Sequence, residues 1–268
     1  MALPPPDPAS TCLVTGASAG IGADIARELA ARGHGVALVA RREDRLRELA
    51  GELERGHGVR AEVVAGDVAD AADRERVMAE IADRGLAVEV LVNNAGFGSA
   101  GAFQGLDPDR EVMMVRTNVE AVVALCGAYV AAMVERGRGA VLNLASVAGF
   151  HPLPRQATYS ATKAFVLAFT EALDADLSGT GVRATAVCPG PVKSEFEEQA
   201  GIDGAFDALP SFTVLSSAQT ARAAVRAVER GKRSEIPGVT NVLAAYAGRF
   251  APRTVSLPVL RAAYLPRR

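Results

Sequence analysis

Residues 11–33 read TCLVTGASAGIGADIARELAARG, and this stretch decides the fold class of the chain. Its first five residues are an apolar run typical of a buried β-strand, and the amphipathic residues after the glycines are typical of a helix of about four turns. Gly16, Gly20 and Gly22 permit a tight turn and let a pyrophosphate approach backbone N–H groups at the helix N-terminus. The Ser18 hydroxyl can add a hydrogen bond there. The stretch therefore predicts the first strand–turn–helix unit of a dinucleotide-binding sheet.

The rest of the chain repeats this alternation of strand and helix. Further apolar runs predict strands near residues 35–40, 59–65, 88–92, 141–146, 182–187 and 234–236. Helices are expected between them, including long ones over 108–136 and 157–177. This order predicts a single-domain α/β protein with a doubly wound parallel sheet (Rossmann fold) in three layers, α/β/α.

The alternation covers residues 11–236 and leaves segments with other expected roles. Residues 1–10 carry four prolines and are expected to form a flexible lead-in. Residues 193–212 follow the sixth strand, where a polar, glycine-containing segment can act as a substrate lid. Residues 237–268 hold five arginines and no acid. This basic, apolar C-terminal extension either touches an anionic membrane surface or a partner, or packs on the substrate side or in a subunit contact, and we favour packing.

Composition narrows the function classes. The chain has 268 residues, 49% apolar and 22% charged, which suits one large α/β domain. Its net charge of −2 gives no support for a nucleic-acid partner. Cys12, Cys126 and Cys188 are widely spaced and odd in number, so we expect no metal site and a reducing, cytoplasmic compartment. The N-terminus lacks a signal-peptide pattern, and without a run of about eighteen apolar residues no transmembrane segment is expected.

Two arginines, Arg41 and Arg42, stand at the end of the second predicted strand, where dinucleotide folds meet the adenosine ribose. Guanidinium groups there would bind a 2′-phosphate, and the first acid, which would suit the free hydroxyl of NAD, is Glu43. We therefore expect NADP(H) as the preferred cofactor, with NAD(H) as the alternative. The competing interpretation is that the arginines only start a solvated helix. Asp67 is expected either to meet the adenine amino group or to cap the next helix, a role that Asp70 also suits.

A second stretch, Tyr159–Lys163, reads YSATK at the start of a predicted helix. The spacing of four places the phenol and the ammonium on one helix face. An ammonium favours the phenolate, so we expect the pKa of Tyr159 to fall from about 10 towards neutrality, which suits a general acid or base. Ser146, at the end of the fifth strand, is expected to hold the oxygen being protonated. A tyrosine and a lysine at this spacing usually have only a structural role when they occur alone. The cofactor site predicted earlier in the chain is what favours a catalytic role here.

Further predictions concern the surroundings of this pair. Asn118 lies among buried-looking residues of the long helix, where it either satisfies a backbone carbonyl at a helix irregularity or anchors a water near Lys163. His151 is expected at the surface. The large apolar residues after the sixth strand are expected either to line a substrate pocket or to pack over it: Phe196, Ile202, Phe206 and Phe212.

Taken in this order, the motifs resemble those of the short-chain dehydrogenase/reductase family. The resemblance covers residues 11–236 and rests on TGASAGIG, NNAG, Asn118, Ser146, YSATK and PGPV. It implies hydride transfer between a nicotinamide and a carbonyl or secondary-alcohol carbon. Tyr159 would donate the proton in reduction and Ser146 would hold the carbonyl. Lys163 would lower the pKa of the tyrosine and bind the nicotinamide ribose, and Asn118 would hold a water.

The resemblance also implies the residues that meet the cofactor: Gly16, Ser18, Gly20, Ile21, Gly22, Arg41, Arg42, Asp67, Val68, Asn94, Ala95, Gly96, Tyr159, Lys163, Pro189, Gly190, Val192 and Ser194. Many NADP-dependent members have a basic residue where this chain has Ala19, so the preference for a 2′-phosphate rests on Arg41 and Arg42. The C-terminal extension is similar to a branch near ketosteroid and long-chain 3-oxoacyl reductases. That similarity implies an apolar ketone or 3-oxoacyl substrate.

Two other functions fit the same fold, because fold does not fix function. A dinucleotide-binding sensor or scaffold would keep the cofactor site without turnover, but it would not need the tyrosine, serine and lysine. An epimerase or dehydratase of the family would carry a larger substrate domain than this chain provides. Family members are often dimers or tetramers, so a small-molecule substrate and a homodimer or homotetramer are expected.

Overall fold

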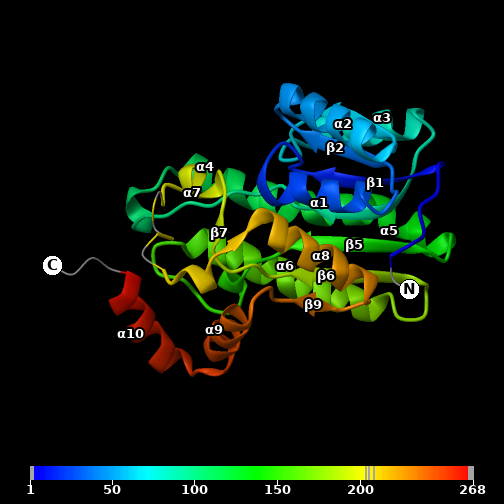
Figure 1. Cartoon of the computed structure of the whole chain (residues 1–268). Helices are drawn as coiled ribbons and strands as arrows, with labels where there is room; N and C mark the ends of the chain where they lie inside the picture. Colours follow the sequence, from blue (N-terminus) through cyan, green and yellow to red (C-terminus); the bar gives the residue numbers. More distant parts are fainter. Residues whose placement is uncertain (1–2, 203, 205, 208, 265–268) are drawn as a thin grey trace.

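The chain folds around a seven-stranded sheet in the order β3–β2–β1–β4–β5–β6–β9, and every neighbouring pair is parallel. The computed structural model describes residues 3–264 except 203, 205 and 208. The strands of the sheet are β1 Ser10–Thr15, β2 Val36–Ala40, β3 Ala61–Ala65, β4 Ala87–Asn93, β5 Gly139–Leu144, β6 Val182–Val187 and β9 Ser234–Glu235. Helices cover both faces (Figure 1), so the predicted doubly wound parallel sheet is confirmed.

Helices fill the connections between the strands. They are α1 Gly20–Ala30, α2 Glu43–His57, α3 Ala71–Asp83, α4 Pro108–Val115, α5 Ala121–Glu135, α6 Ala157–Asp176, α7 Phe196–Ala200, α8 Ser217–Glu229, α9 Val239–Phe250 and α10 Arg253–Tyr264. A π-helical turn, Arg116–Glu120, joins α4 to α5, so the predicted long helix is one run with an irregularity in it. Two short strands, β7 Val192–Lys193 and β8 Leu215–Ser216, pair apart from the main sheet.

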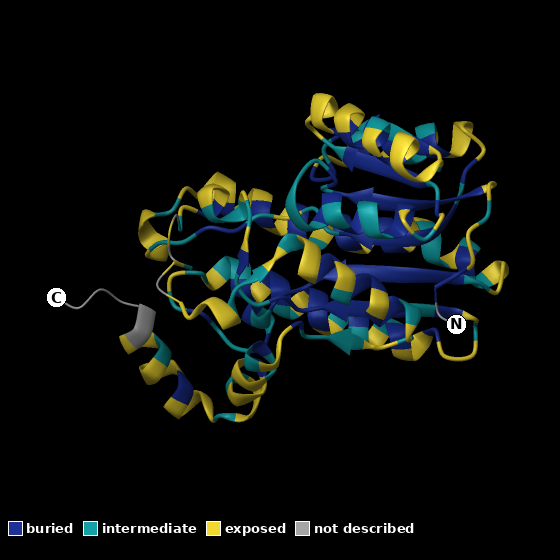
Figure 2. Ribbon diagram, in the orientation of Figure 1, coloured by how far each residue is buried: buried dark blue, intermediate teal, exposed yellow. Residues whose placement is uncertain are grey.

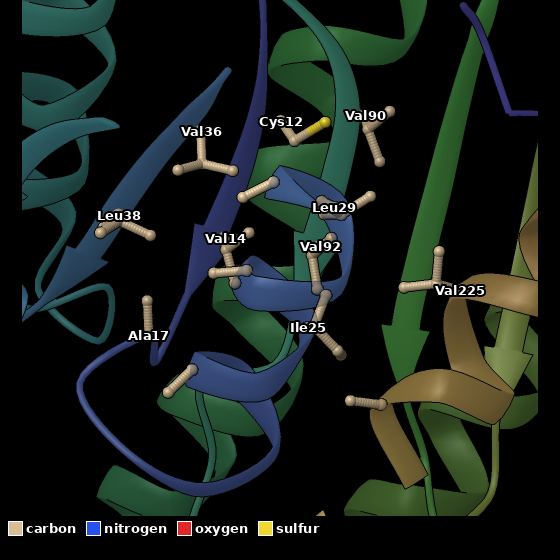
Figure 3. Packing of buried hydrophobic residues seen from close by; sticks show 14 of the residues in the cluster. Cys12, Val14, Ala17, Ile25, Leu29, Val36, Leu38, Val90, Val92 and Val225 are labelled. Carbon is tan, nitrogen blue, oxygen red and sulfur yellow. The ribbon is translucent and has the colours of Figure 1, made fainter. Parts of the chain in front are cut away.

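The central strands are buried on both faces, so successive side chains enter two different cores. Val14 packs in one core with Ile25 of α1 and Val225 of α8 (Figure 3). Its neighbour Leu13 packs in the other core, which α3, α5 and α6 complete. Burying a side chain of this size stabilises the fold by about 1.5–3 kcal/mol, so the end of β1 is firmly held.

The strand order places a ligand crevice beside β1. This strand lies between β2 and β4, and the register pairs Val14 with both Leu38 and Val92. The carboxyl ends of the three strands therefore lie together at the glycine turn that follows β1. In open parallel sheets, ligands bind at such a point, where the strand order reverses.

The run Pro108–Glu135 is the one helix in the described part of the chain that is long and apolar enough to cross a membrane by length and composition. Its most apolar 18-residue window has a mean hydropathy of 1.6. Core helices of α/β proteins meet the same criteria. This run contributes Leu125, Cys126 and Met133 to the second core, and its length and composition are weak grounds for a membrane span.

The C-terminal extension is helical and only partly packed. In α9, Asn241 and Ala245 are buried against the body, whereas α10 extends away from it (Figures 1 and 2). Large apolar side chains remain exposed on both helices: Val239, Leu243, Tyr246, Phe250, Val255, Leu257 and Val259. Two of the five arginines of this extension, Arg267 and Arg268, lie outside the described residues.

Candidate active site

A cavity of about 1110 Å³ opens at the carboxyl ends of the strands. It is lined by the glycine turn after β1 and by residues that follow β2, β3, β4, β5 and β6. The sequence-predicted residues that line it are Gly16, Ser18, Gly20, Ile21, Arg41, Arg42, Asp67, Val68, Asn94, Ala95, Gly96, Ser146, Tyr159, Lys163, Pro189, Gly190, Val192 and Ser194. Gly22 and Asn118 stand behind the wall, so they support the cavity without facing it.

The glycine turn is shaped by close packing. Gly16 and Gly20 have φ angles of +64° and +56°, which favour glycine. A Cβ on Gly16 would lie 2.8 Å from the Cα of Ala95, and one on Gly22 would overlap the backbone of Gly16. The Asn94 amide braces the turn because it donates to the carbonyls of Thr15 (3.0 Å) and Gly16 (3.2 Å). Only glycine fits this turn, and the backbone it leaves open fits an approaching pyrophosphate.

Arg42 lines the cavity at the end of β2. Its guanidinium donates to the Ser18 hydroxyl at 3.1 and 3.2 Å and forms an ion pair with Glu195 at 2.8 Å. Arg41 is 77% exposed, and its guanidinium lies 3.8 Å from the Asp67 carboxylate. Both arginines face the same cavity as the glycine turn, which a merely solvated helix start would not require.

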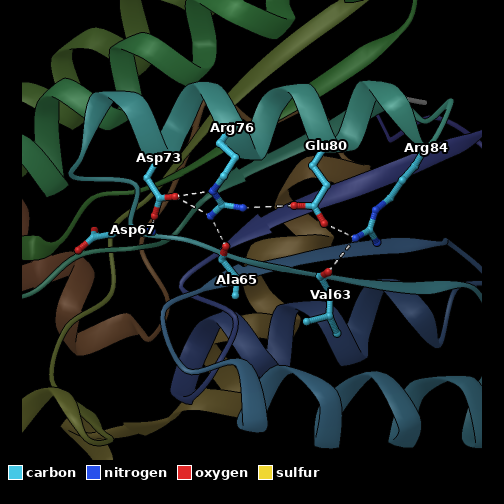
Figure 4. A network of polar contacts seen from close by, with 7 residues as sticks. All are labelled: Val63, Ala65, Asp67, Asp73, Arg76, Glu80 and Arg84. Atoms are coloured by element: carbon cyan, nitrogen blue, oxygen red, sulfur yellow. Dashed lines mark hydrogen bonds and ion pairs between the residues drawn. The ribbon is translucent and has the colours of Figure 1, made fainter.

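The end of β3 is fixed by a polar network, which excludes one of the two roles expected of Asp67, that of helix cap. Asp70 caps α3 by accepting from the backbone N–H of Asp73 at 2.8 Å, so the cap is not Asp67. The Asp73 carboxylate in turn accepts from the backbone of Asp67 at 2.6 Å and pairs with Arg76 (Figure 4). Arg76 also donates to the carbonyl of Ala65 in β3. Asp67 is thereby held at the rim with its carboxylate 39% exposed towards the cavity.

Ser146, Tyr159 and Lys163 meet at the other end of the cavity. Ser146 follows β5, its hydroxyl accepts from the backbone of Ala148 at 3.1 Å and donates to the carbonyl of Pro189 at 3.4 Å. The ammonium of Lys163 donates to the carbonyl of Leu144 at 2.7 Å and lies 5.9 Å from the centre of the Tyr159 ring. The lysine is therefore anchored to β5 beneath the tyrosine ring.

Burial dominates the titration of this group. It raises the pKa of Tyr159 to about 12, although the adjacent Ser146 hydroxyl opposes the rise. It lowers the pKa of Lys163 to about 8. The prediction that the lysine draws the tyrosine towards neutrality is therefore wrong for the protein itself, because desolvation of the phenolate outweighs a cation that is anchored to a carbonyl. The phenol is therefore protonated at neutral pH.

Asn118 lies within the π-helical turn and is 1% exposed. Its amide donates to the carbonyl of Phe97 (3.0 Å) and to the Thr162 hydroxyl (3.1 Å), and its oxygen accepts from the backbone of Phe97 (3.2 Å). The predicted helix irregularity is present, but the carbonyl that Asn118 satisfies belongs to the loop after β4. A Cβ on Gly96 would lie 2.9 Å from the Asn118 oxygen, so this loop needs glycine there.

The end of the cavity around Tyr159 combines aromatic side chains with a few charged ones. The Phe196 ring lies 5.5 Å from the Tyr159 ring, and Ile202 and Phe206 also line the cavity. Phe212 does not line it and is 69% exposed. Five further residues line it that no sequence motif marks: Phe97, Arg110, Leu153, Arg155 and Gln156.

His151 also lines the cavity, and its predicted surface position is wrong. The side chain is half-buried against Gly248 of α9, where a Cβ on the glycine would overlap the imidazole. Burial, together with the nearby Arg253, holds the pKa of His151 below its usual value. The C-terminal extension therefore reaches the wall of the cavity, which local sequence around His151 does not reveal.

No group of three or more metal-ligating side chains occurs among the residues that the structure describes. The chemistry that these side chains can perform is hydrogen bonding to an oxygen by Ser146 and proton transfer by Tyr159. At the opposite end, backbone N–H groups and two arginines suit a phosphorylated cofactor.

Comparison with known proteins gives consistent matches. The family model of short chain dehydrogenases matches residues 10–203. Sulfoacetaldehyde reductase 2 of Chromohalobacter salexigens is 41% identical over 201 residues, which are 74% of this chain and 79% of that protein. A putative ketoacyl reductase of Streptomyces coelicolor is 40% identical over 184 residues, 68% of this chain and 70% of that one. The structure of a short-chain dehydrogenase from Sphingobium yanoikuyae in complex with NADPH has a TM-score of 0.79 at 33% identity and covers 95% of this chain and 94% of its own.

Proposed function

The chain belongs to the short-chain dehydrogenase family, whose members are NAD(P)-dependent oxidoreductases, and from this premise we propose that it is an NADPH-dependent carbonyl reductase. The reverse reaction, oxidation of a secondary alcohol, uses the same site. One observation carries the proposal: the protonated phenol of Tyr159 and the glycine turn flanked by Arg41 and Arg42 line one cavity. Neither a sensor nor a scaffold needs the first of these.

When bound, the reduced nicotinamide supplies the hydride. The residues of the chain would bind and protonate the carbonyl oxygen of the substrate. The Ser146 hydroxyl would donate a hydrogen bond to the substrate carbonyl and orient it. Tyr159 would transfer its phenolic proton to that oxygen as negative charge develops there. A pKa of about 12 keeps the phenol protonated at neutral pH, which suits the direction of reduction. Lys163, anchored to Leu144, would stabilise the phenolate left behind and meet the nicotinamide ribose.

The cofactor preference that we propose is NADP(H) over NAD(H). The glycine turn fits a pyrophosphate, and the end of β2 presents Arg41 and Arg42. The first acid after this strand, Glu43, forms an ion pair with Arg47 in its own helix, so it does not take the place of a 2′-phosphate. The NADPH complex of the similar Sphingobium enzyme supports this preference.

The substrate that we propose is an apolar ketone or a 3-oxoacyl compound. The aromatic side chains of Phe97 and Phe196 and the apolar Leu153, Ile202 and Phe206 line the substrate side. Such walls bury hydrocarbon more favourably than polar groups. The similar ketoacyl reductase supports the 3-oxoacyl class.

The assembly that we propose is a homodimer or homotetramer. The surface of α4 and α5 exposes apolar side chains, among them Val112, Val115 and Val123, and Phe165 of α6 is also exposed. Exposed apolar side chains on neighbouring helices favour association between copies. The expected compartment remains the cytoplasm.

The test of the proposed function is consumption of NADPH against a panel of ketones, aldehydes and 3-oxoacyl thioesters, with NADH in parallel. Turnover that prefers NADPH and bulky apolar ketones or 3-oxoacyl thioesters is expected. Tight binding of NADPH without consumption over the whole panel would favour the sensor instead. Retention of the cofactor with conversion of a sugar nucleotide would favour an epimerase.

A further inference from the structure

Arg42 has two partners in the structure, and they come from two different segments of the cavity lining. The Ser18 hydroxyl belongs to the glycine turn, and the Glu195 carboxylate belongs to the segment after β7. The ion pair of Arg42 with Glu195, at 2.8 Å, joins residues 153 positions apart in the sequence. The two side chains are 42% and 43% exposed, so an incoming ligand can reach the pair.

Glu195 is held near Arg42 by its neighbours. Phe196, the next residue, lies 5.5 Å from the Tyr159 ring, and its ring sits so close to Gly98 that a Cβ there would be 2.8 Å away. The backbone of Phe196 also donates to the Ser194 hydroxyl at 3.4 Å. The packing of Phe196 therefore holds the carboxylate of the adjacent Glu195 close to Arg42.

We propose that Glu195 is a specificity-determining residue that competes with the 2′-phosphate of the cofactor for Arg42. A phosphate monoester carries a charge of about −1.5 to −2 at neutral pH, and a guanidinium binds it through paired N–H groups. Glu195 occupies part of that fork, and it repels a second anion beside it. A cofactor with a free 2′-hydroxyl meets no such competition. Glu195 therefore lowers the preference of the site for NADP(H) over NAD(H).

The exposure of the Arg42 and Glu195 side chains sets how much Glu195 can weaken the binding of a 2′-phosphate. Ion pairs between exposed side chains are weak because water screens them, so removing the competing carboxylate should strengthen phosphate binding by about two- to fivefold. Salt should reduce the difference further. The inference rests on the proposed use of a dinucleotide cofactor, but not on the identity of the substrate.

The test is calorimetric binding of 2′,5′-ADP and of 5′-AMP to the full chain and its variants. These fragments differ by the 2′-phosphate alone and need no turnover. Glu195→Gln is expected to bind 2′,5′-ADP about two- to fivefold more tightly than the parent does, with 5′-AMP unchanged. Glu198→Gln is the matched control, because Glu198 is an exposed acid of α7, three residues after the N-cap Glu195, and does not line the cavity. It should leave the binding of both fragments unchanged.

Each other outcome overturns the inference. If Glu195→Gln binds 2′,5′-ADP as the parent does, or less tightly, Glu195 does not compete and instead orients Arg42. If Glu198→Gln produces the same gain, the effect is one of general charge and not of the ion pair. If the parent itself binds the two fragments equally, the proposed NADP(H) preference fails together with the competition.

Discussion

The two ends of the cavity each hold a cation, and the surroundings of the two cations are opposite. Arg42 has a side chain that is 42% exposed and shares its charge between a hydroxyl and a carboxylate. Lys163 is 7% exposed and has a backbone carbonyl as its partner. Burial has lowered the pKa of the lysine to about 8. An exposed cation can discriminate between ligands with little effect on the free energy of unfolding. A buried cation affects both the free energy of unfolding and the reaction.

This contrast first predicts that the largest effect on turnover lies at the buried end. Tyr159→Phe removes only the transferable proton, so kcat for carbonyl reduction should fall by about 10²–10⁴-fold. The Kd of NADPH, measured by fluorescence titration, should change little. An equal loss of cofactor affinity would mean that Tyr159 holds the cofactor and does not act as the acid.

At the exposed end, the double variant Arg41→Ala with Arg42→Ala should act on cofactor choice alone. Loss of charge-assisted hydrogen bonds to the 2′-phosphate should weaken NADPH binding by about 10–100-fold. The Kd of NADH is the internal control and should hold within about twofold. Parallel weakening of the two cofactors would mean that the arginines only begin a solvated helix.

At the buried end, removal of the Lys163 charge should increase stability and abolish activity. Lys163→Met keeps the volume and removes a buried charge, so it should raise the free energy of unfolding at neutral pH by about 1–3 kcal/mol while turnover is lost. Urea denaturation measures the first and NADPH consumption the second. Destabilisation by the substitution would show that the bond to Leu144 outweighs the desolvation of the ammonium.

The same lysine gives that prediction a pH dependence. Its pKa is about 8 when folded and 10.5 ordinarily, so between these values the unfolded chain binds a proton that the folded chain does not. The contribution of Lys163 to the free energy of unfolding of the parent therefore rises with pH through this window, and the cost of burying the ammonium is fully present below it. The methionine variant lacks this contribution, so its gain in stability over the parent should shrink between about pH 7 and about pH 10, which denaturation of both proteins at the two pH values can measure.

The smallest effect is expected at Arg155, which also lines the cavity. It is the one non-glycine residue with a positive φ, +68°, in the described part of the chain. Arg155→Gly should raise the free energy of unfolding by about 0.5 kcal/mol, because relief of strain slightly exceeds the entropy that glycine adds to the unfolded chain. Arg230→Gly, at an exposed helix end with φ of −85°, is the control and should be destabilising. Equal losses in both would mean that Arg155 is unstrained.

The sequence predicts those features that are local. The strand Val182–Val187 and the glycine turn depend on neighbouring residues, and the structure reproduces both. The pairing of Arg42 with Glu195 and the packing of His151 on Gly248 depend on chain segments far apart, so no motif announces them. The pKa predicted for Tyr159 is wrong for the same reason. The spacing of four brings Lys163 near Tyr159. Only the tertiary structure decides how far water is excluded from the site and which backbone carbonyl accepts a hydrogen bond from the ammonium.

In the proposed reaction, a hydride passes within this cavity from NADPH to a carbonyl carbon. The most direct measurement uses NADPH carrying deuterium on the transferred position, pooled ketones, aldehydes and 3-oxoacyl thioesters, and mass spectrometry of the products. We predict an alcohol that carries one deuterium, formed by the parent protein and not by Tyr159→Phe. Labelled NADPH that binds fully yet leaves deuterium in no product would contradict the claim and leave a protein that senses the cofactor.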